Sequence, residues 1–205
     1  GWSTLARQGG FVLLYPEQRK SNNSNLCFNW FRPSAVARDR GELMSIRQMI
    51  DHACETHQID RRRIYVQGLS AGGAMASALL ATYPDLFAAG QIVAGLPFGA
   101  ARDAMSALSV MKSGANRSPS EWGDLVRGVT PEIKRRPLVS IWQGTGDRIV
   151  SPANARSILS QWLNVYGLDE QAAKAVSIKG HAAQVWSDEK GRPLVELCLI
   201  EGLGH

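Results

Sequence analysis

The sequence has few of the features that assign a protein to a class on their own. It contains only three cysteines, Cys27, Cys54 and Cys198, and no C-x-x-C pair, so a zinc site is not expected and at most one internal disulfide can form. No apolar run approaches the roughly 20 residues of a membrane span. Repeats, low-complexity tracts and the glycine-rich fingerprints of dinucleotide and phosphate loops are also missing. We therefore expect neither a metal nor a cofactor.

The composition is that of a folded domain with a small excess of positive charge. Hydrophobic residues make up 44% of the chain and charged residues 20%, and the formal net charge is +5, which is ordinary for a globular protein. The basic clusters at 61–63 and 133–136 each precede an apolar run that we interpret as a strand. Active sites of open parallel sheets lie at the opposite, C-terminal ends of the strands. The clusters therefore predict solvated surface and no nucleic-acid partner.

Apolar runs alternate with segments of helical spacing along most of the chain. The predicted elements are strands at 10–16, 62–67, 90–95, 137–143 and 174–180, a hairpin over 181–202, and helices at 43–57, 70–84 and 151–167. Strands that alternate with helices are typical of βαβ units. We expect a single α/β domain over residues 1–205, with a mostly parallel sheet and helices on both faces.

A long segment at about 97–136 separates two of the predicted strands. It contains a helical stretch at 101–111 and a capping box at 118–121, with Ser118 at the N-cap, Pro119 in the first helical position and Glu121 in the third. A segment that leaves a strand at its C-terminal end is a candidate cap over a site. An ordinary surface crossover is the alternative, and the sequence leaves both open.

The pentapeptide GLSAG at 68–72 fits the pattern G-x-S-x-G between a predicted strand and a predicted helix. This pattern puts the serine on a strained strand-to-helix turn, where side chains at Gly68, Gly72 and Gly73 are expected to clash. Ser70 would lie at a helix N-terminus, whose free N–H groups favour a developing negative charge. A serine in an ordinary tight turn fits the same letters, so a catalytic role requires a base and an acid elsewhere.

The base is expected to be one of four histidines, because a pKa near neutrality lets an imidazole take and return a proton. His52 and His57 fall on a predicted helix, and His181 follows a glycine at a turn. His205 follows the C-terminal end of an apolar strand on a glycine-rich loop. Only His205 is therefore predicted to share a sheet edge with Ser70.

The orienting carboxylate is also expected beyond the C-terminal end of a strand. Asp147 meets this condition in the loop QGTGD, which we expect Gly144 and Gly146 to make flexible. The remaining candidates lie in or after helices or at the hairpin turn, namely Asp85, Asp103, Asp124 and Asp188. The chain order Ser70, Asp147, His205 is that of the α/β-hydrolases. It predicts a serine nucleophile, its acid and its base, with the Ala71 N–H as one oxyanion donor.

Seven stretches of the chain together resemble the esterase, poly(3-hydroxybutyrate) depolymerase family: FVLLYPEQ, NLCFNWF, SIRQMIDH, RIYVQGLSAGG, GLSAGGAMASALLATYPDLFAAGQIVAGLPFG, QGTGDRIVSPANA and LIEGLGH. The resemblance implies an α/β-hydrolase fold and the same roles for Ser70, Asp147 and His205. It implies hydrolysis of poly- or oligo(3-hydroxybutyrate) or related short-chain esters, with an ester or polyester as the partner. The chain is also similar to feruloyl and acetylxylan esterases, which is the alternative function. An extracellular location is implied, with the cytoplasm as the alternative.

Three departures from the family are visible. Members carry an earlier strand whose backbone supplies a second oxyanion donor, and they continue beyond the position of His205. We therefore expect a core cut from a longer protein, lacking its N-terminal strands and that donor. Members also often have a histidine where this chain has Gln143, a change that we expect to be tolerated because Asp147 is kept.

Apolar residues beside the predicted strand ends are candidates for a substrate groove: Leu69, Leu96, Phe98, Trp30 and Phe31. Packing in the core is an equal alternative for the aromatic ones. Because a fold does not fix a function, a binding protein on a hydrolase fold is a second alternative, and a peptidase a third. Reaction with an organophosphate serine reagent separates the binding protein from an enzyme, and amide substrates separate the peptidase from an esterase.

Overall fold

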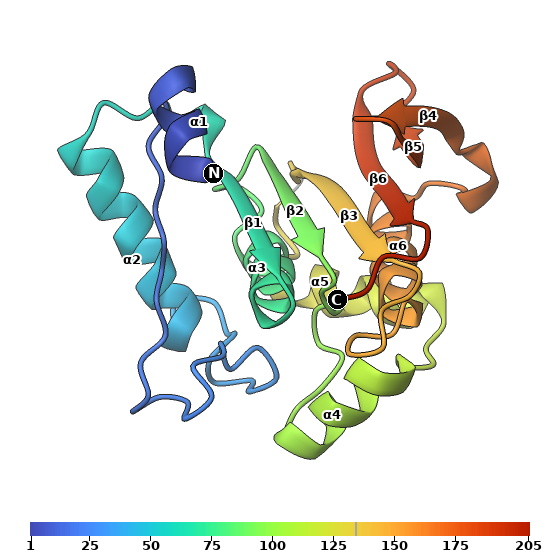
Figure 1. Ribbon diagram of the computed structural model, residues 1–205, viewed down its shortest axis with the longest axis horizontal. Coiled ribbons are helices and arrows are strands. Elements are labelled where there is room, and N and C mark those ends of the chain that lie inside the picture. The colour runs from blue at the N-terminus through green and yellow to red at the C-terminus, as the bar shows by residue number, and fades with distance from the viewer. Residues whose placement is uncertain (134) are drawn as a thin grey trace.

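The computed structural model describes residues 1–133 and 135–205, which form a six-stranded sheet with helices around it (Figure 1). The strands are β1 (Tyr65–Leu69), β2 (Ala89–Val93), β3 (Leu138–Gly144), β4 (Lys174–Ile178), β5 (His181–Ser187) and β6 (Pro193–Ile200). Their spatial order is β1-β2-β3-β6-β5-β4. The first four strands in this spatial order, β1, β2, β3 and β6, are mutually parallel. Strand β5 is antiparallel to both of its neighbours, β6 and β4. This is the mostly parallel sheet that the sequence predicts.

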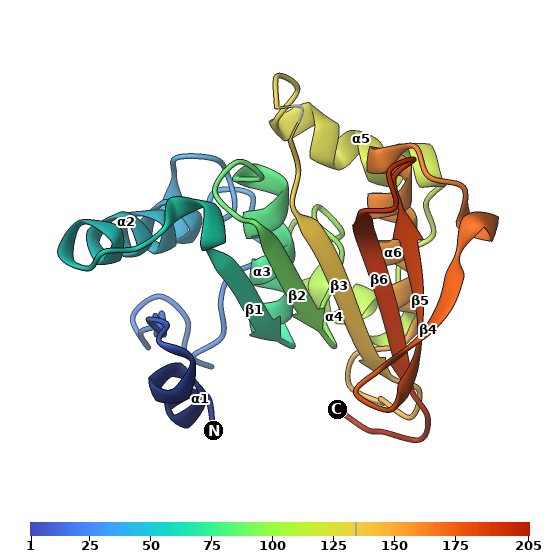
Figure 2. The ribbon, with the colours of Figure 1, turned by 90° about the horizontal axis from the view of Figure 1, so that it is seen from above.

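Helices cover the sheet mainly from one side. The helices are α1 (Trp2–Gly9), α2 (Gly41–Thr56), α3 (Ala71–Thr82), α4 (Ala104–Ser113), α5 (Pro119–Val129) and α6 (Ala153–Tyr166). Helix α3 packs on β1 and β2, α6 packs on β3 and β6, and α5 packs on α6. Figure 2 shows these three helices on one side of the sheet and α1 on the other, where α1 buries none of its residues. The helices of residues 1–133 and 135–205 all fall short of the length and apolar character of a membrane span.

The main core lies between the sheet and the helices. Burial alternates along β2 and β3, so that Ile92, Val139 and Ile141 face the helices. A second, smaller cluster, here called the edge cluster, lies beneath the C-terminal ends of the strands. Its buried members are Trp30, Ala74, Leu96, Ala100, Ala101, Ala107, Val110, Trp122 and Val150. The edge cluster joins α3, the long 97–136 segment and the loop after β3 into one packed unit.

The predicted strand at 10–16 is wrong. Gly10 ends α1 in a left-handed conformation, and the residues after it run as extended chain without strand pairing to any described residue. Their large side chains stay in solvent, with Tyr15 59% and Val12 49% exposed. An apolar run becomes a strand only where a neighbouring strand takes its backbone hydrogen bonds, and the described chain provides none here.

The segment 97–136 contains α4 and α5. The predicted capping box is present: the Ser118 hydroxyl accepts the Glu121 N–H, and the Glu121 carboxylate accepts the Ser118 N–H. Both helices bury one face, for example Val110 of α4 and Trp122 of α5. Lys134, which belongs to this segment and to the predicted basic cluster, lies outside the described residues. That this segment forms a cap over a functional site stays a prediction.

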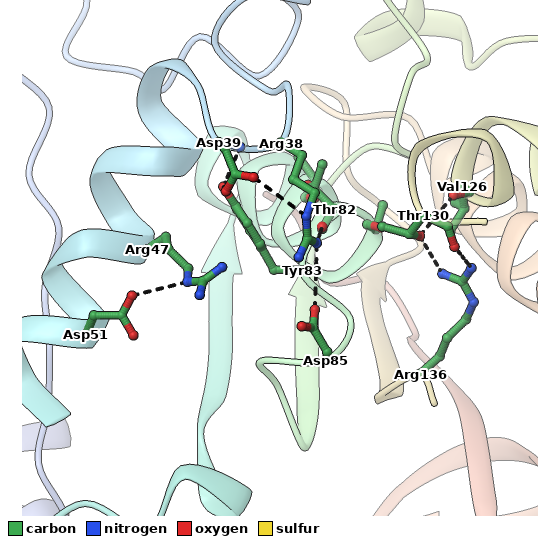
Figure 3. Close-up of polar contacts among 12 residues, drawn as sticks. Arg38, Asp39, Arg47, Asp51, Thr82, Tyr83, Asp85, Val126, Thr130 and Arg136 are labelled. Carbon is green, nitrogen blue, oxygen red and sulfur yellow. Dashed lines mark hydrogen bonds and ion pairs between the residues drawn. The ribbon is translucent and has the colours of Figure 1, made fainter. Parts of the chain in front are cut away.

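Polar contacts fix the far end of α3 (Figure 3). Tyr83 is fully buried, and the guanidinium carbons of Arg38 and Arg47 lie 4.8 and 5.2 Å from the centre of its ring. Its hydroxyl accepts the Asp39 N–H at 2.7 Å, and burial raises the pKa of this phenol. Arg38 also donates to the Thr82 carbonyl. These contacts tie α3, whose N-cap is Ser70, to the loop before α2.

Candidate active site

Ser70 lies on a strained turn between β1 and α3. Its φ and ψ are 57° and −121°, a region that non-glycine residues rarely adopt. The Ser70 N–H donates to the Val93 carbonyl at 3.0 Å, and the Ser70 carbonyl accepts the Ala74 N–H at 2.9 Å. The backbone is therefore held on both sides of the serine, and the side chain is left half-exposed at the C-terminal edge of the sheet.

Two of the three glycines around Ser70 are required by close packing. A Cβ at Gly68 would lie 1.9 Å from the Gly72 carbonyl oxygen, and one at Gly73 would lie 2.8 Å from the Val93 oxygen. A Cβ at Gly72 would meet nothing within 4 Å. The prediction that all three positions exclude a side chain is therefore wrong for Gly72. Its own Cβ position points to open space, and only its carbonyl approaches Gly68.

Asp147 lies in the loop after β3 with a fully buried side chain. Its Oδ1 accepts the N–H groups of Ile149 and Val150 at 2.8 and 2.9 Å. Its Oδ2 lies 2.8 Å from His205 Nδ1 and accepts Gln143 Nε2 at 3.0 Å. Burial opposes ionisation of this carboxyl, but the hydrogen bonds it accepts outweigh burial and hold its pKa below the usual value. Asp147 is thus a fixed, buried anion.

His205 is carried to Asp147 by a tail that follows β6. The Gly146 N–H donates to the Leu203 carbonyl at 3.0 Å, and the Gly202 N–H donates to the Thr145 hydroxyl at 2.9 Å. A Cβ at Gly144 would lie 2.2 Å from the Leu203 oxygen. Glycine in this loop therefore permits a close backbone approach, and the expected flexibility of the loop stays a prediction.

The structure brings two of the three predicted catalytic side chains into contact. Asp147 and His205 are hydrogen-bonded, and Figure 1 places the C-terminus, which is His205, near the ends of β2 and β3, the edge at which β1 also ends. Within residues 1–133 and 135–205, His205 bonds to Asp147 but not to Ser70. Catalytic hydrogen bonds are often long in a protein without substrate. The Ala71 N–H belongs to the first turn of α3, where helical N–H groups lack an intrahelical acceptor.

The five substrate-groove candidates divide into two sets. Leu96 is 1% exposed and Trp30 9%, both inside the edge cluster, and Phe98 is 9% exposed in the main core. Leu69 is 57% exposed beside Ser70, and Phe31 is half-buried against the edge cluster. In the structure, Leu96, Trp30 and Phe98 are therefore packed in the hydrophobic core. A substrate contact by any of the five stays a prediction.

Gln143 takes a part in the site that was not predicted from the sequence. This side chain lies on the buried face of β3 and reaches the Asp147 carboxylate. The available signal was its place in the strand, because alternation puts position 143 on the same face as Val139 and Ile141. A buried amide there needs a polar partner, and Asp147 is four residues away.

All three cysteines are free, and no three metal-ligating side chains gather in the described part of the chain.

The sequence of this chain is similar to those of known esterases and depolymerases. The family model described as Esterase PHB depolymerase matches residues 2–183. Poly(3-hydroxyalkanoate) depolymerase C of Paucimonas lemoignei is 41% identical over 100% of this chain and 50% of its own length. Feruloyl esterase B of Thermothelomyces thermophilus is 32% identical over 98% of this chain and 70% of its own. The chain therefore spans half the length of the depolymerase that it matches.

A solved structure supports the fold. An acetyl xylan esterase from Aspergillus awamori superposes with a TM-score of 0.89 and 24% identity, covering 100% of this chain and 76% of that one. At 24% sequence identity, the similarity of the two structures supports the fold alone. It confirms the predicted α/β-hydrolase fold.

Proposed function

The chain belongs to the Esterase PHB depolymerase family, and from this premise we propose that it is the catalytic part of a serine carboxylic-ester hydrolase. Ser70 is the nucleophile, His205 the base and Asp147 the acid that orients His205. The observation that carries the proposal is the Asp147–His205 hydrogen bond of 2.8 Å at the edge where the strained Ser70 turn lies.

In the first half of the reaction, Ser70 Oγ attacks the carbonyl carbon of the ester. His205 Nε2 takes the hydroxyl proton, and the buried Asp147 carboxylate stabilises the imidazolium that forms. The carbonyl oxygen becomes an oxyanion, and the Ala71 N–H at the start of α3 donates to it. The C–O bond to the alcohol then breaks, His205 returns the proton to the departing alcohol, and an acyl-enzyme remains on Ser70.

In the second half, water replaces the alcohol. The oxygen of the water attacks the acyl carbon while His205 takes a proton from the water. The Ala71 N–H donates to the new oxyanion, as in the first half. The Ser70 Oγ–acyl bond breaks, and Oγ regains a proton from His205. The products are one carboxylic acid and one alcohol, and the site returns to its starting state.

We propose poly- or oligo(3-hydroxybutyrate) or a related short-chain ester as the substrate. This choice is supported by the 41% identity to a poly(3-hydroxyalkanoate) depolymerase over the whole of this chain. A feruloyl or acetylxylan ester is the second candidate, favoured by the 32% identity to a feruloyl esterase of which the chain covers 70%.

The experiment compares rates of hydrolysis for wild type, Ser70→Ala and Ser77→Ala. Ser77 is a matched control because it is a serine of the same helix with no exposed surface. We expect Ser70→Ala to lower kcat on a short p-nitrophenyl ester by about a millionfold and Ser77→Ala to leave it nearly unchanged. Near wild-type turnover by Ser70→Ala would overturn the proposal.

The same assay decides between the substrate classes. A 3-hydroxybutyrate oligomer, methyl ferulate and acetylated xylan are offered to the wild type at equal concentrations of ester bonds. We expect the highest kcat/KM on the hydroxybutyrate oligomer. A higher value on methyl ferulate or on acetylated xylan would favour the second candidate and leave the assignment of Ser70 unchanged.

A further inference from the structure

Gln143 connects the two ends of the loop that carries Asp147. Its side chain is 2% exposed. Its Nε2 lies 3.3 Å from the Gly144 carbonyl, 3.0 Å from Asp147 Oδ2 and 3.2 Å from the Val150 carbonyl. One amide nitrogen therefore reaches the start of the loop, its end and the carboxylate between them.

The orientation of this amide is fixed by its surroundings. All three neighbours of the nitrogen are acceptors, so turning the amide over would place its oxygen against three other oxygens. In the observed orientation Oε1 is buried and has no hydrogen-bond partner among the described residues. The donor bonds are kept although the acceptor is left without a partner, which is costly in a protein interior.

We propose that Gln143 is a positioning residue, which fixes Asp147 Oδ2 so that this oxygen holds the His205 imidazole in its working orientation. This inference rests on the proposed esterase function. Oδ1 of Asp147 is already held by two backbone N–H groups, whereas among the residues that the structure describes Oδ2 has only Gln143 and His205 as partners. Within the described part of the chain, Gln143 is thus the one group besides the base that fixes the position of Oδ2.

The chemistry of an amide suits this place. It donates a hydrogen bond without carrying a proton that it can lose, so it stabilises the Asp147 anion throughout the catalytic cycle. It also brings no second charge beside the imidazolium that forms when Ser70 attacks. Removing Gln143 is therefore expected to slow the chemical step and to leave substrate binding unchanged.

Asn154 provides a control with nearly the same local bonding. Asn154 has no exposed surface, and its Oδ1 is buried with no hydrogen-bond partner in the described ranges 1–133 and 135–205. Its Nδ2 donates to three backbone carbonyls, those of Val110, Met111 and Ser151. The two amides thus share burial, three acceptors and an orphaned oxygen. They differ in that only Gln143 touches the catalytic carboxylate, so a comparison of the two separates positioning from simple packing.

The experiment measures kcat, KM and thermal stability for Gln143→Leu, Asn154→Leu and Gln143→His. We expect Gln143→Leu to lower kcat about tenfold, as the loss of a hydrogen bond to a charged group implies, with KM within about twofold of wild type. We expect Asn154→Leu to lower the melting temperature by a similar amount and to keep kcat within about twofold. Gln143→His restores an N–H donor and is expected to recover most of the rate.

A second readout needs neither turnover nor a Gln143 variant. In NMR spectra of Asp147→Asn, the side-chain amide resonances of Gln143 are expected to shift relative to wild type, and those of Asn154 are not. Unchanged Gln143 resonances, or an equal loss of kcat in Gln143→Leu and Asn154→Leu, would overturn the positioning role. If the wild type hydrolyses no ester, the proposed function fails, and the NMR comparison still decides whether Gln143 holds Asp147.

Discussion

The tail at 200–205 and the segment at 10–16 make an instructive pair. The tail follows β6 and contains a turn at Glu201 and Gly202, whereas the segment runs as extended chain where a strand was predicted. The tail is bonded to the loop after β3 through Thr145, Gly146 and Asp147. The segment forms no strand pairing with the described residues and leaves Tyr15 and Val12 about half-exposed. Apolar character alone therefore does not order the chain, and the candidate chemistry lies where the backbone is held by partners.

The largest expected difference between the two regions is in the rate of catalysis. Asp147→Asn keeps the size of the side chain but replaces the anion and changes the tautomer that it holds on His205. We expect kcat on a p-nitrophenyl ester to fall by about 10⁴-fold with KM nearly unchanged. Steady-state kinetics tests this, and an unchanged kcat would mean that another acid orients the base.

Crowding the tail is expected to have the next largest effect. Gly144→Ala would bring a Cβ to 2.2 Å from the Leu203 carbonyl oxygen, so the tail must move and His205 with it. A displacement of about 1 Å at a reacting group costs about a hundredfold in rate, and we expect a loss of that size together with a lower melting temperature. Gly204→Ala is the matched variant on the same tail, because its Cβ would meet nothing within 4 Å. Equal melting temperatures for the two variants would contradict this account of the loop.

The stability that Asp147 contributes is expected to depend on pH. Its folded pKa is lowered because the hydrogen bonds it accepts outweigh burial. A carboxyl of this kind contributes stability above its unfolded pKa, about 3.9, and loses it as the pH falls through the folded pKa. We expect wild type to exceed Asp147→Asn in unfolding free energy at neutral pH and the difference to shrink below about pH 4. Denaturant titrations across this range measure it, and a difference that grows on acidification would reverse the assigned sign.

The smallest effect is expected in the segment at 10–16. Tyr15 is 59% exposed, so Tyr15→Ser should change the free energy of unfolding by no more than about 0.5 kcal/mol. The rate of ester hydrolysis should also stay at the wild-type value. Denaturant unfolding and one kinetic assay check both statements, and a loss of several kcal/mol would show that this segment is held by contacts that its exposure does not suggest.

Much of the molecule could be predicted from local patterns. The alternation of strands and helices predicted the α/β sheet, and the predicted strands at 90–95 and 137–143 are present as β2 and β3. The meeting of Asp147 and His205 could be predicted from topology, since both follow strands that prove to be parallel neighbours. The turn at Ser70 followed from its glycines, two of which prove to be sterically required.

The remaining features depend on contacts between distant residues. The close approach of Leu203 to Gly144 cannot be recognised from glycine content, which suggests flexibility equally well. The burial of Trp30 and Leu96 in the edge cluster depends on α4 and α5 packing beside them. Gln143 was predicted only to be a tolerated departure; its place in β3 indicates a buried amide, but the fold is needed to show that Asp147 Oδ2 is its partner.

Covalent labelling of the wild-type protein tests the proposed catalytic role of Ser70 most directly. The protein is treated with an organophosphate serine reagent, and the modified residue is located by mass spectrometry of its peptides. The account predicts a single adduct on Ser70, absent in Ser70→Ala and formed much more slowly in His205→Ala. An adduct on another residue, or equal labelling of wild type and His205→Ala, would contradict it.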